Sequence, residues 1–339
     1  MSNIDNIVSK LDHGNNLSVE ESSYVSNQMF NGLMSDDQII KVLEFINKNG
    51  VSINEIIGFA TSMRKISKKV SLNFKVIDTC GTGGDGLGTF NISTCSSFIA
   101  AACGVKIAKH GNKAITSSSG SADLLHDAGA KIDLNPEQVR KCIEELNFGF
   151  MFAPMHHQAM KNVANARKAI SPNKTIFNLL GPITNPAGAD IQLIGVYNVD
   201  SMKLLAQALL KLGTRRAILV NSKDGLDEAS IYDLTYVTEI KDNKIAEYTI
   251  NPDDYHLKGK ELKNIITDSH KSSLDMTLAV FNNEDSDALK IAVLNASLLV
   301  MLYKDCDTIN DAITECMEAL SNYSVRDKFN QYIDFTNQV

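Results

Sequence analysis

One segment of the chain combines glycines with small polar side chains at close spacing. It reads DTCGTGGDGLGTFNIST from Asp78 to Thr94. Glycine lets a backbone turn tightly and brings consecutive N–H groups against a ligand, an arrangement that suits an anion. Thr89, Asn91, Ser93 and Thr94 stand where a helix is expected to begin, and the N-terminus of a helix attracts negative charge. The segment therefore predicts a phosphate-binding loop.

Two other uses of the same glycines have to be weighed. Gly81, Gly83 and Gly86 satisfy the G-x-G-x-x-G fingerprint of dinucleotide-binding proteins, but that fold expects an acidic residue at the end of the second strand to hold the ribose. Here the second expected strand ends in Lys109 and His110. The lysine and hydroxyl residue that complete a P-loop are also missing after the glycines. A glycine-rich loop that serves only the fold remains the alternative.

A second candidate is the segment KHGNKAITSSSGSAD, from Lys109 to Asp123. A cation at the carboxyl end of a strand, beside the glycine-rich loop, could meet a second phosphate charge. A lysine followed by loop serines is also typical of a solvated surface. The position next to the phosphate-binding loop favours the functional interpretation.

A third candidate is the carboxylate pair Asp227 and Glu228, in the segment DGLDE that follows an expected strand at 217–221. Carboxylates in such a loop can coordinate Mg²⁺ directly or through its waters, and phosphate oxygens of a substrate can complete the octahedron. An Asp-Gly turn at the surface is the alternative. Beside a phosphate site, the pair predicts a magnesium site.

Arg167 is a fourth candidate, on an expected helix at 159–169. The planar guanidinium suits a bidentate carboxylate. An arginine on a mostly apolar helix can equally be an exposed residue whose stem covers apolar surface. The spacing does not choose between these two. The neighbouring His156 and His157 have no evident further ligands, so they do not predict a metal site.

The elements that must position these residues alternate along the chain. The first seventy residues predict helices only, with capping boxes that begin at Ser18, Ser35 and Ser52. Strands expected at 74–78, 105–108, 150–152, 192–196 and 217–221 then alternate with helices, which indicates βαβ units and a largely parallel sheet. A helical stretch at 155–185 interrupts this order, and helices are expected again at 286–303 and 309–320.

Bulk properties narrow the class of protein. The chain of 339 residues is long for one core, which predicts a large domain with a smaller one. A net charge of −7 argues against nucleic-acid binding, and the longest apolar runs are too short to span a bilayer. The first residues lack the features of a secretory signal peptide. Six cysteines without a CxxC pair suit reduced thiols, so a cytoplasmic protein is expected.

Taken together, six motifs occur in a fixed order, and the chain resembles the anthranilate phosphoribosyltransferase family. They are GTGGD at 81–85, NIST at 91–94, KHGN at 109–112, SGSAD at 119–123, FNLLGPITNP at 177–186 and DGLDE at 224–228. The resemblance implies the nucleoside phosphorylase and phosphoribosyltransferase class III fold, which is α/β with a small all-helical domain and a mainly parallel sheet in the larger one. The helical domain would comprise residues 1–72 and an insert around 158–186. The α/β domain would comprise 73–157 and 187–339.

The resemblance also implies an activity and an assembly. The family transfers the phosphoribosyl group of phosphoribosyl pyrophosphate (PRPP) to anthranilate in tryptophan biosynthesis, with one or two Mg²⁺ ions. Its members are usually homodimers formed through the helical domains. We therefore expect the small molecules PRPP and anthranilate as partners, and neither nucleic acid nor membrane.

Carried over by motif, the resemblance assigns residues to three groups. The PRPP group is Gly81, Gly84, Asp85, Thr89, Asn91, Ile92, Ser93, Thr94, Lys109, Asn112, Ser117 and Ser121. The metal group is Ser93, Asp227 and Glu228. The anthranilate group is Gly81, His110, Asn112, Arg167 and Pro182. No general base is assigned, and His110 is the nearest candidate.

The chain departs from the family pattern near the acceptor residues. The usual His-Pro-Ala-Met reads HQAM from His157, and the usual Gly-x-Arg reads SPNK from Ser171 to Lys174, one residue longer. A nucleoside phosphorylase of the same fold is the nearest rival. Its reaction needs no metal that bridges pyrophosphate, so the Asp227–Glu228 pair, which indicates such a metal, argues against it. A catalytically silent, nucleic-acid-binding relative should carry a basic groove, which the net charge of −7 disfavours.

Overall fold

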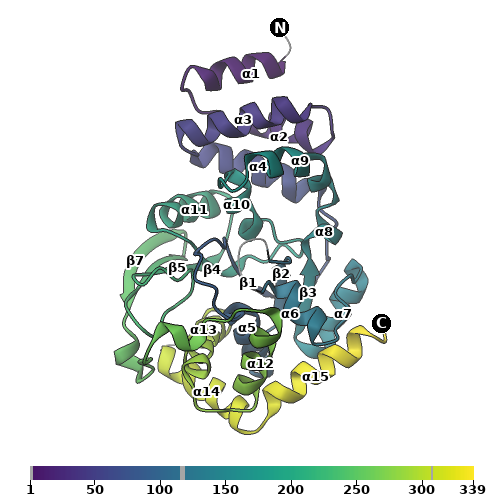
Figure 1. The fold of residues 1–339 in the computed structure, drawn as a ribbon. Coiled ribbons are helices and arrows are strands. Elements are labelled where there is room, and N and C mark those ends of the chain that lie inside the picture. Colours follow the sequence, from purple (N-terminus) through teal and green to yellow (C-terminus); the bar gives the residue numbers. More distant parts are fainter. Residues whose placement is uncertain (1–2, 115–118, 307) are drawn as a thin grey trace.

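A seven-stranded sheet forms the centre of the larger part of the molecule (Figure 1). The computed structural model describes residues 3–114, 119–306 and 308–339. Five strands are parallel, and two at one edge are antiparallel. The order is β3-β2-β1-β4-β5-β6-β7, and the bounds are β1 Ile77–Gly81, β2 Ile107–Gly111, β3 Phe148–Phe152, β4 Ile191–Gly195, β5 Arg216–Ser222, β6 Thr235–Lys241 and β7 Lys244–Ile250. The prediction of an α/β fold with a mainly parallel sheet is confirmed.

The first two strands begin later and end later than the apolar pattern indicates. β1 continues through Thr79 and Cys80 to Gly81, which lies opposite Gly195 of β4. Parallel pairing depends on the backbones of neighbouring strands, so polar residues and glycines can complete a strand that apolar residues start. Both strands thereby carry their polar ends, including Lys109 and His110 on β2, into the ladder.

The β6–β7 hairpin was not predicted. Asp242 and Asn243 join the two strands, both with positive φ, at 52° and 57°. Two consecutive left-handed residues are typical of a tight hairpin turn, and Asp and Asn tolerate them better than other residues with a side chain. The Asp-Asn pair is the signal in the sequence that could have located this hairpin.

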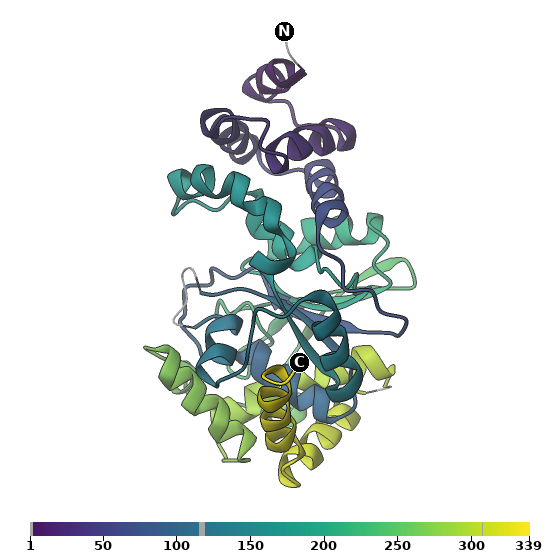
Figure 2. The same ribbon diagram turned by 90° about the vertical axis from the view of Figure 1, so that its right-hand side faces the viewer.

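The N-terminal helices form one end of the molecule (Figures 1 and 2). The capping boxes at Ser18, Ser35 and Ser52 are confirmed. Two later helices pack against α3 and α4, although they are far away in sequence. The bounds are α1 Asn3–Asp12, α2 Val19–Phe30, α3 Asp36–Asn49, α4 Ile53–Ile66, α9 Ala164–Ile170 and α10 Ile176–Leu180. The helix expected at 159–169 is a 3₁₀ turn, η1 Gln158–Val163, followed by α9.

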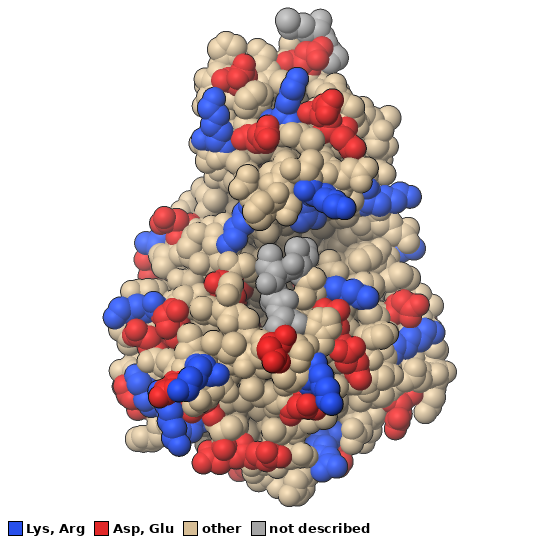
Figure 3. All heavy atoms as spheres, viewed as in Figure 1, with Lys and Arg blue, Asp and Glu red and all other residues tan. Residues whose placement is uncertain are grey.

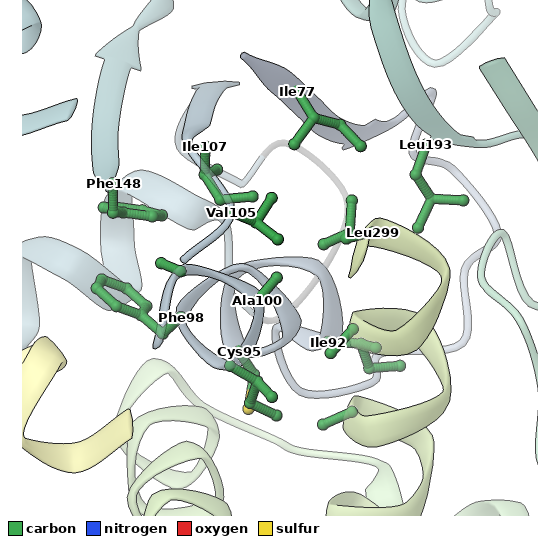
Figure 4. Close-up of a cluster of buried hydrophobic side chains, with 14 of the residues drawn as sticks. Ile77, Ile92, Cys95, Phe98, Ala100, Val105, Ile107, Phe148, Leu193 and Leu299 are labelled. Atoms are coloured by element: carbon green, nitrogen blue, oxygen red, sulfur yellow. The ribbon is translucent and has the colours of Figure 1, made fainter. Parts of the chain in front are cut away.

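Helices cover both faces of the sheet. α5 Ile92–Ala102 and α13 Asp287–Lys304 pack on one face, where Phe98 stacks on Phe148 with ring centroids 4.1 Å apart (Figure 4). α11 Val199–Lys211 packs on the other face. The remaining helices are α6 Ser121–Asp127, α7 Pro136–Leu146, α8 Ala153–His156, α12 His270–Phe281, α14 Ile309–Ser321 and α15 Ser324–Thr336, with 3₁₀ turns η2 Gly181–Ile183, η3 Pro252–Tyr255 and η4 Leu262–Ile265. No described helix is long and apolar enough to cross a membrane.

Two hydrophobic cores divide the molecule. One lies between the sheet and α5, α13, α14 and α15. The other joins the N-terminal helices to the opposite face of the sheet, because Phe59 of α4 and Leu205 of α11 belong to the same buried cluster. The division into residues 1–72 with 158–186, and 73–157 with 187–339, stays a prediction.

The strand order reverses direction between β1 and β4, in the interior of the sheet. The chain runs from β1 outward to β2 and β3 and then returns to β4 on the other side of β1. Ligands of open α/β sheets bind outside the carboxyl ends of the strands at such a reversal. The glycine-rich loop follows β1 at this point, so it lies where the fold predicts a ligand-binding site.

Candidate active site

The loop after β1 has the backbone freedom that the sequence indicated. Gly83, Gly84, Gly86 and Gly88 have φ values of 63°, 84°, 74° and 68°. Residues with a side chain rarely adopt this left-handed region, so glycine is needed at these turns. Residues 82–88 belong to no helix or strand. The N–H groups of Thr82, Gly83 and Leu87 have partners within the protein, whereas no hydrogen bond of the described chain engages those of residues 84–86 and 88, which leaves these for a ligand.

The start of α5 supplies polar groups beside the loop. Asn91 caps the helix, since its Oδ1 accepts the Thr94 N–H at 3.1 Å. Thr94 is fully buried, and its Oγ1 has no hydrogen-bond partner among the described residues. Ile92 is 2% exposed and packs in the core, so only its backbone can face a ligand. Thr89 forms a bridge with Ile266 at the end of the loop.

Lys109 points from β2 toward the start of α5. Its ammonium donates to the Thr79 carbonyl at 2.7 Å and to Ser93 Oγ at 3.1 Å, and the residue is 1% exposed. Burial lowers the pKa of Lys109, while the carboxylates of Asp78 and Glu228 act in the opposite direction. A buried cation is thus held between the first strand, the helix start and the acidic loop.

The loop between β5 and β6 crosses over the glycine-rich loop. The Gly83 N–H donates to Asp227 Oδ2 at 3.2 Å. A Cβ at Gly81 would lie 2.8 Å from that oxygen, and a Cβ at Gly195 would lie 1.7 Å from the Asp227 carbonyl. Glycines at the ends of two adjacent strands therefore let Asp227 reach the loop. Gly195 is a site residue that the sequence analysis missed, although a glycine that ends an apolar strand was a usable signal.

The carboxylates at this crossing repel one another. Burial raises the pKa of Asp227 to about 7, and Asp85 adds to the shift. Burial and the charge of Asp227 also raise the pKa of Glu228. Crowded carboxylates at the edge of an anion-binding loop are the oxygen ligands that Mg²⁺ prefers, and a cation would relieve their repulsion.

The carboxylates alone do not complete a metal site. In the described ranges, no three His, Cys, Asp or Glu side chains are arranged to hold a metal ion by themselves. Mg²⁺ usually takes one or two protein carboxylates and completes its shell with substrate phosphate oxygens and water. The donor set of Ser93, Asp227 and Glu228 fits an ion that binds together with a phosphate ligand.

The His110 side chain points away from α5, on the opposite side of β2 from the Lys109 ammonium. The backbone N–H of His110 donates to the buried Asp78 Oδ1 at 3.1 Å. The ring Nδ1 of His110 lies 3.3 Å from the Gly181 carbonyl, next to Pro182. The His157 ring packs against it with centroids 5.0 Å apart. Burial, with His157 as the second cause, lowers the pKa of His110 to about 3. The imidazole is therefore neutral at pH 7.

Acidification should lower the free energy of unfolding because His110 is buried in its neutral form. Between about pH 6.5 and 3 the unfolded chain binds a proton at His110 that the folded protein does not, so stability falls as the pH falls. The slope from this residue reaches about 1.4 kcal/mol per pH unit. His110→Gln should flatten the slope in denaturant titrations at several pH values, whereas His126→Gln, at an exposed site, should not. Equal slopes in all three proteins would contradict the assignment.

The remaining predicted residues surround the end of β2. Asn112 follows the strand, and its carbonyl accepts the Ala122 N–H at 3.2 Å. Ser121 begins α6 beside Gly111, where a Cβ would lie 3.1 Å from Ser121 Oγ. Ser117 lies outside the described residues. The structure thus brings the predicted donor residues together around the ends of β1 and β2.

Comparison with known proteins shows the family of the chain. The model of the glycosyl transferase family a/b domain matches residues 73–324. A curated anthranilate phosphoribosyltransferase of Hydrogenovibrio crunogenus is 41% identical over 322 residues, which cover 94% of each chain. The enzyme of the same name from Priestia megaterium is 40% identical and covers 93% of each. The chain belongs to the anthranilate phosphoribosyltransferase family.

Solved anthranilate phosphoribosyltransferases have the same fold. The Thermus thermophilus structure is 30% identical, with a TM-score of 0.90 over 98% of this chain and 99% of that one. A Saccharomyces cerevisiae structure in complex with PRPP and Mg has a TM-score of 0.90 at 23% identity, over 99% of this chain and 98% of that one. At that identity the yeast likeness concerns the fold alone.

The anthranilate phosphoribosyltransferase resemblance assigns Arg167 to the acceptor, and the structure places it on α9 of the helical end. Its guanidinium lies 5.1 Å from the centre of the Phe177 ring. Burial lowers the pKa of Arg167, and no described acidic residue forms an ion pair with it. A partly buried cation without a carboxylate partner can receive one from a ligand. No described contact links Arg167 to the donor residues.

The helical end and the α/β part meet at an indentation of the face drawn in Figure 3. Acidic and basic side chains alternate over that face without a continuous basic surface. One further residue crosses between the two parts. Lys174, in the segment where the chain departs from the family pattern, donates to the Gly84 carbonyl at 3.1 Å. No sequence motif predicted a role for this lysine.

Proposed function

We propose that the enzyme transfers the 5-phosphoribosyl group of PRPP to the amine of anthranilate. The products are N-(5-phosphoribosyl)anthranilate and pyrophosphate, and the reaction is a step of tryptophan biosynthesis. The observation that carries the proposal is the contact between the Gly83 N–H and Asp227, because it joins the anion-binding loop to the carboxylate loop. Family membership supplies the acceptor.

The donor site addresses the charge that develops on the leaving group. When the bond from ribose C1 to pyrophosphate breaks, the pyrophosphate gains negative charge. The Lys109 ammonium, held by Thr79 and Ser93, provides a fixed positive charge for it, and such preorganised charge lowers the barrier. The glycine-loop N–H groups and the start of α5 bind the phosphates. Ser93, Asp227 and Glu228 would hold one or two Mg²⁺ ions, which neutralise pyrophosphate charge when bound.

The acceptor site needs to orient its substrate rather than activate it. An aromatic amine is neutral at pH 7, so its nitrogen lone pair is available for attack on C1. We propose that Arg167 binds the carboxylate of anthranilate, and that Gly81, His110, Asn112 and Pro182 line its pocket. A histidine whose pKa lies at about 3 is a weak proton acceptor, so we assign no general base.

Removal of the Arg167 side chain should separate the two substrates. Arg167→Ala should raise the KM for anthranilate about 100-fold, because a charge-assisted contact to a carboxylate is lost, and should leave the KM for PRPP within about twofold. Lys168→Ala, at an exposed lysine on the same helix, is the matched control. Steady-state kinetics with each substrate varied in turn measures both constants. Equal increases for both substrates would remove the carboxylate role.

A direct assay tests the reaction itself. Anthranilate is fluorescent, and its loss in the presence of PRPP and Mg²⁺ should be followed with the purified protein. The rival reaction, phosphorolysis of a pyrimidine nucleoside, is tested with uridine or thymidine and phosphate. Nucleoside cleavage without loss of anthranilate would overturn the proposal in favour of the phosphorylase.

For assembly we propose a cytoplasmic homodimer that forms through the helical end. The proposal is supported by the usual homodimeric state of the family and by Leu33, which follows α2 and has an exposed fraction of 64%. A large apolar side chain in this position is suited to burial against a second copy.

A further inference from the structure

We propose that Lys174 is a positioning residue that holds the glycine-rich loop in its ligand-binding shape from the helical end of the molecule. The inference rests on the proposed donor site and adds to it a residue from the other part of the chain. Its basis is a set of contacts at both ends of this one residue.

The backbone of Lys174 is tied to the helical end. Asn47 of α3 donates its side-chain amide to the Lys174 carbonyl at 2.7 Å. The residue stands between α9 and α10, which pack on α3 and α4. Its backbone therefore belongs to the helical end.

The side chain of Lys174 reaches the opposite part. Its ammonium donates to the Gly84 carbonyl at 3.1 Å and lies 3.3 Å from the centre of the Tyr197 ring, which follows β4. The contact with Gly84 is close, since a Cβ there would lie 2.9 Å from Lys174 Cε. Gly84 therefore serves two needs, a positive φ of 84° and room for the lysine.

The middle of the glycine-rich loop has few other hydrogen bonds to the rest of the chain, although Leu87 packs against the core. Its ends are fixed, because the Thr82 N–H donates to the Gly195 carbonyl at 2.8 Å and the Thr267 N–H donates to the Gly88 carbonyl at 2.9 Å. For the backbone of residues 84–87, Lys174 is the one donor from elsewhere in the described chain. Glycines lose much conformational freedom on ordering, so a single charged donor has a large influence on this stretch.

The ammonium also lies in the field of the acidic groups at the site. Desolvation lowers the pKa of Lys174, and Asp227 and Asp85 act against that shift. Asp227 of the proposed metal group and Asp85 of the glycine-rich loop thus both attract the lysine toward the loop. The position of Lys174 next to the donor groups follows from contacts and charge together.

Amide hydrogen exchange of the substrate-free protein tests the positioning role. Lys174→Met keeps an unbranched side chain out to Cε and removes the ammonium, so peptides that cover residues 82–88 should exchange roughly three- to tenfold faster. Lys174→Arg should restore most of the protection. Lys168→Met removes the same charge from an exposed site on α9 and should leave the exchange unchanged.

Kinetics provides the second measurement. Lys174→Met should raise the KM for PRPP about tenfold and lower kcat much less, because a disordered loop weakens donor binding before it affects bond breaking. Unchanged exchange at 82–88 in Lys174→Met would overturn the inference even with a raised KM, since the lysine would then contact the ligand directly. Equal acceleration in Lys168→Met would overturn it as well. The exchange measurement uses no substrate, so its result stands independently if the protein fails to consume anthranilate.

Discussion

Asp227→Asn combined with Glu228→Gln should lower kcat by roughly 10³-fold or more, because charge stabilisation by a metal contributes several kcal/mol to the barrier. The two amides keep the size of the side chains and remove the charges that attract Mg²⁺. The loss should persist at high magnesium concentration, since the ligands themselves are gone. Steady-state assays across a magnesium titration measure the effect.

The fold should survive this change. Burial and mutual repulsion already raise the pKa values of both carboxyls, so neutral side chains relieve a conflict in the folded protein. We expect the Tm of the metal-free double variant to equal or exceed that of the parent. Asp233→Asn in the same loop is the matched control, because that carboxylate only pairs with Lys223 at 3.9 Å and accepts the neighbouring Leu234 N–H at 2.8 Å, a bond that asparagine can keep. Near-normal turnover by the double variant would remove the metal assignment.

Lys109→Met should lower kcat by about 10²- to 10³-fold, the range found when a fixed electrostatic contact to a transition state is removed. The ammonium touches Thr79 and Ser93 and is buried, so it keeps its place without the ligand. The KM for PRPP should change less than kcat, because charge on the leaving pyrophosphate grows at the transition state.

A buried lysine also supports the fold, so stability must be followed in parallel. Lys109→Gln keeps an uncharged hydrogen-bond donor near this position, and its comparison with Lys109→Met helps to separate the loss of charge from the loss of hydrogen bonding. Both variants should have a low kcat. Circular dichroism should show that they remain folded at the assay temperature. Lys131→Met, at an exposed lysine, should be as active as the parent. A folded Lys109→Met protein with a parental kcat would exclude the charge role.

Much of the fold could be predicted from local signals. The capping boxes at Ser18, Ser35 and Ser52 place helix starts because side chain and backbone satisfy each other within four residues. The parallel strands follow from buried apolar runs between helices. The β6–β7 hairpin was missed because β7 is mostly exposed and shows no apolar alternation. Its stability comes from pairing with β6, which is not a local property.

The site shows the same division between local and long-range information. The glycine-rich loop and Lys109 could be found because residue type and strand position carry their chemistry. The roles of Gly195 and Lys174 depend on contacts with Asp227 and Gly84, which are distant in sequence. The departure of the segment before α10 from the family pattern was visible, but only the fold shows that its lysine reaches the donor loop.

One short segment, α9 and the turn after it, carries both Arg167 and Lys174. The first is proposed to meet the acceptor, and the second holds the loop of the donor. Binding free energies that are linked through a common element are reciprocal. Whatever factor of affinity bound PRPP confers on anthranilate through this segment, anthranilate confers the same factor on PRPP. The segment thus couples the binding free energies of the two substrates, although the substrates need not contact the same side chain.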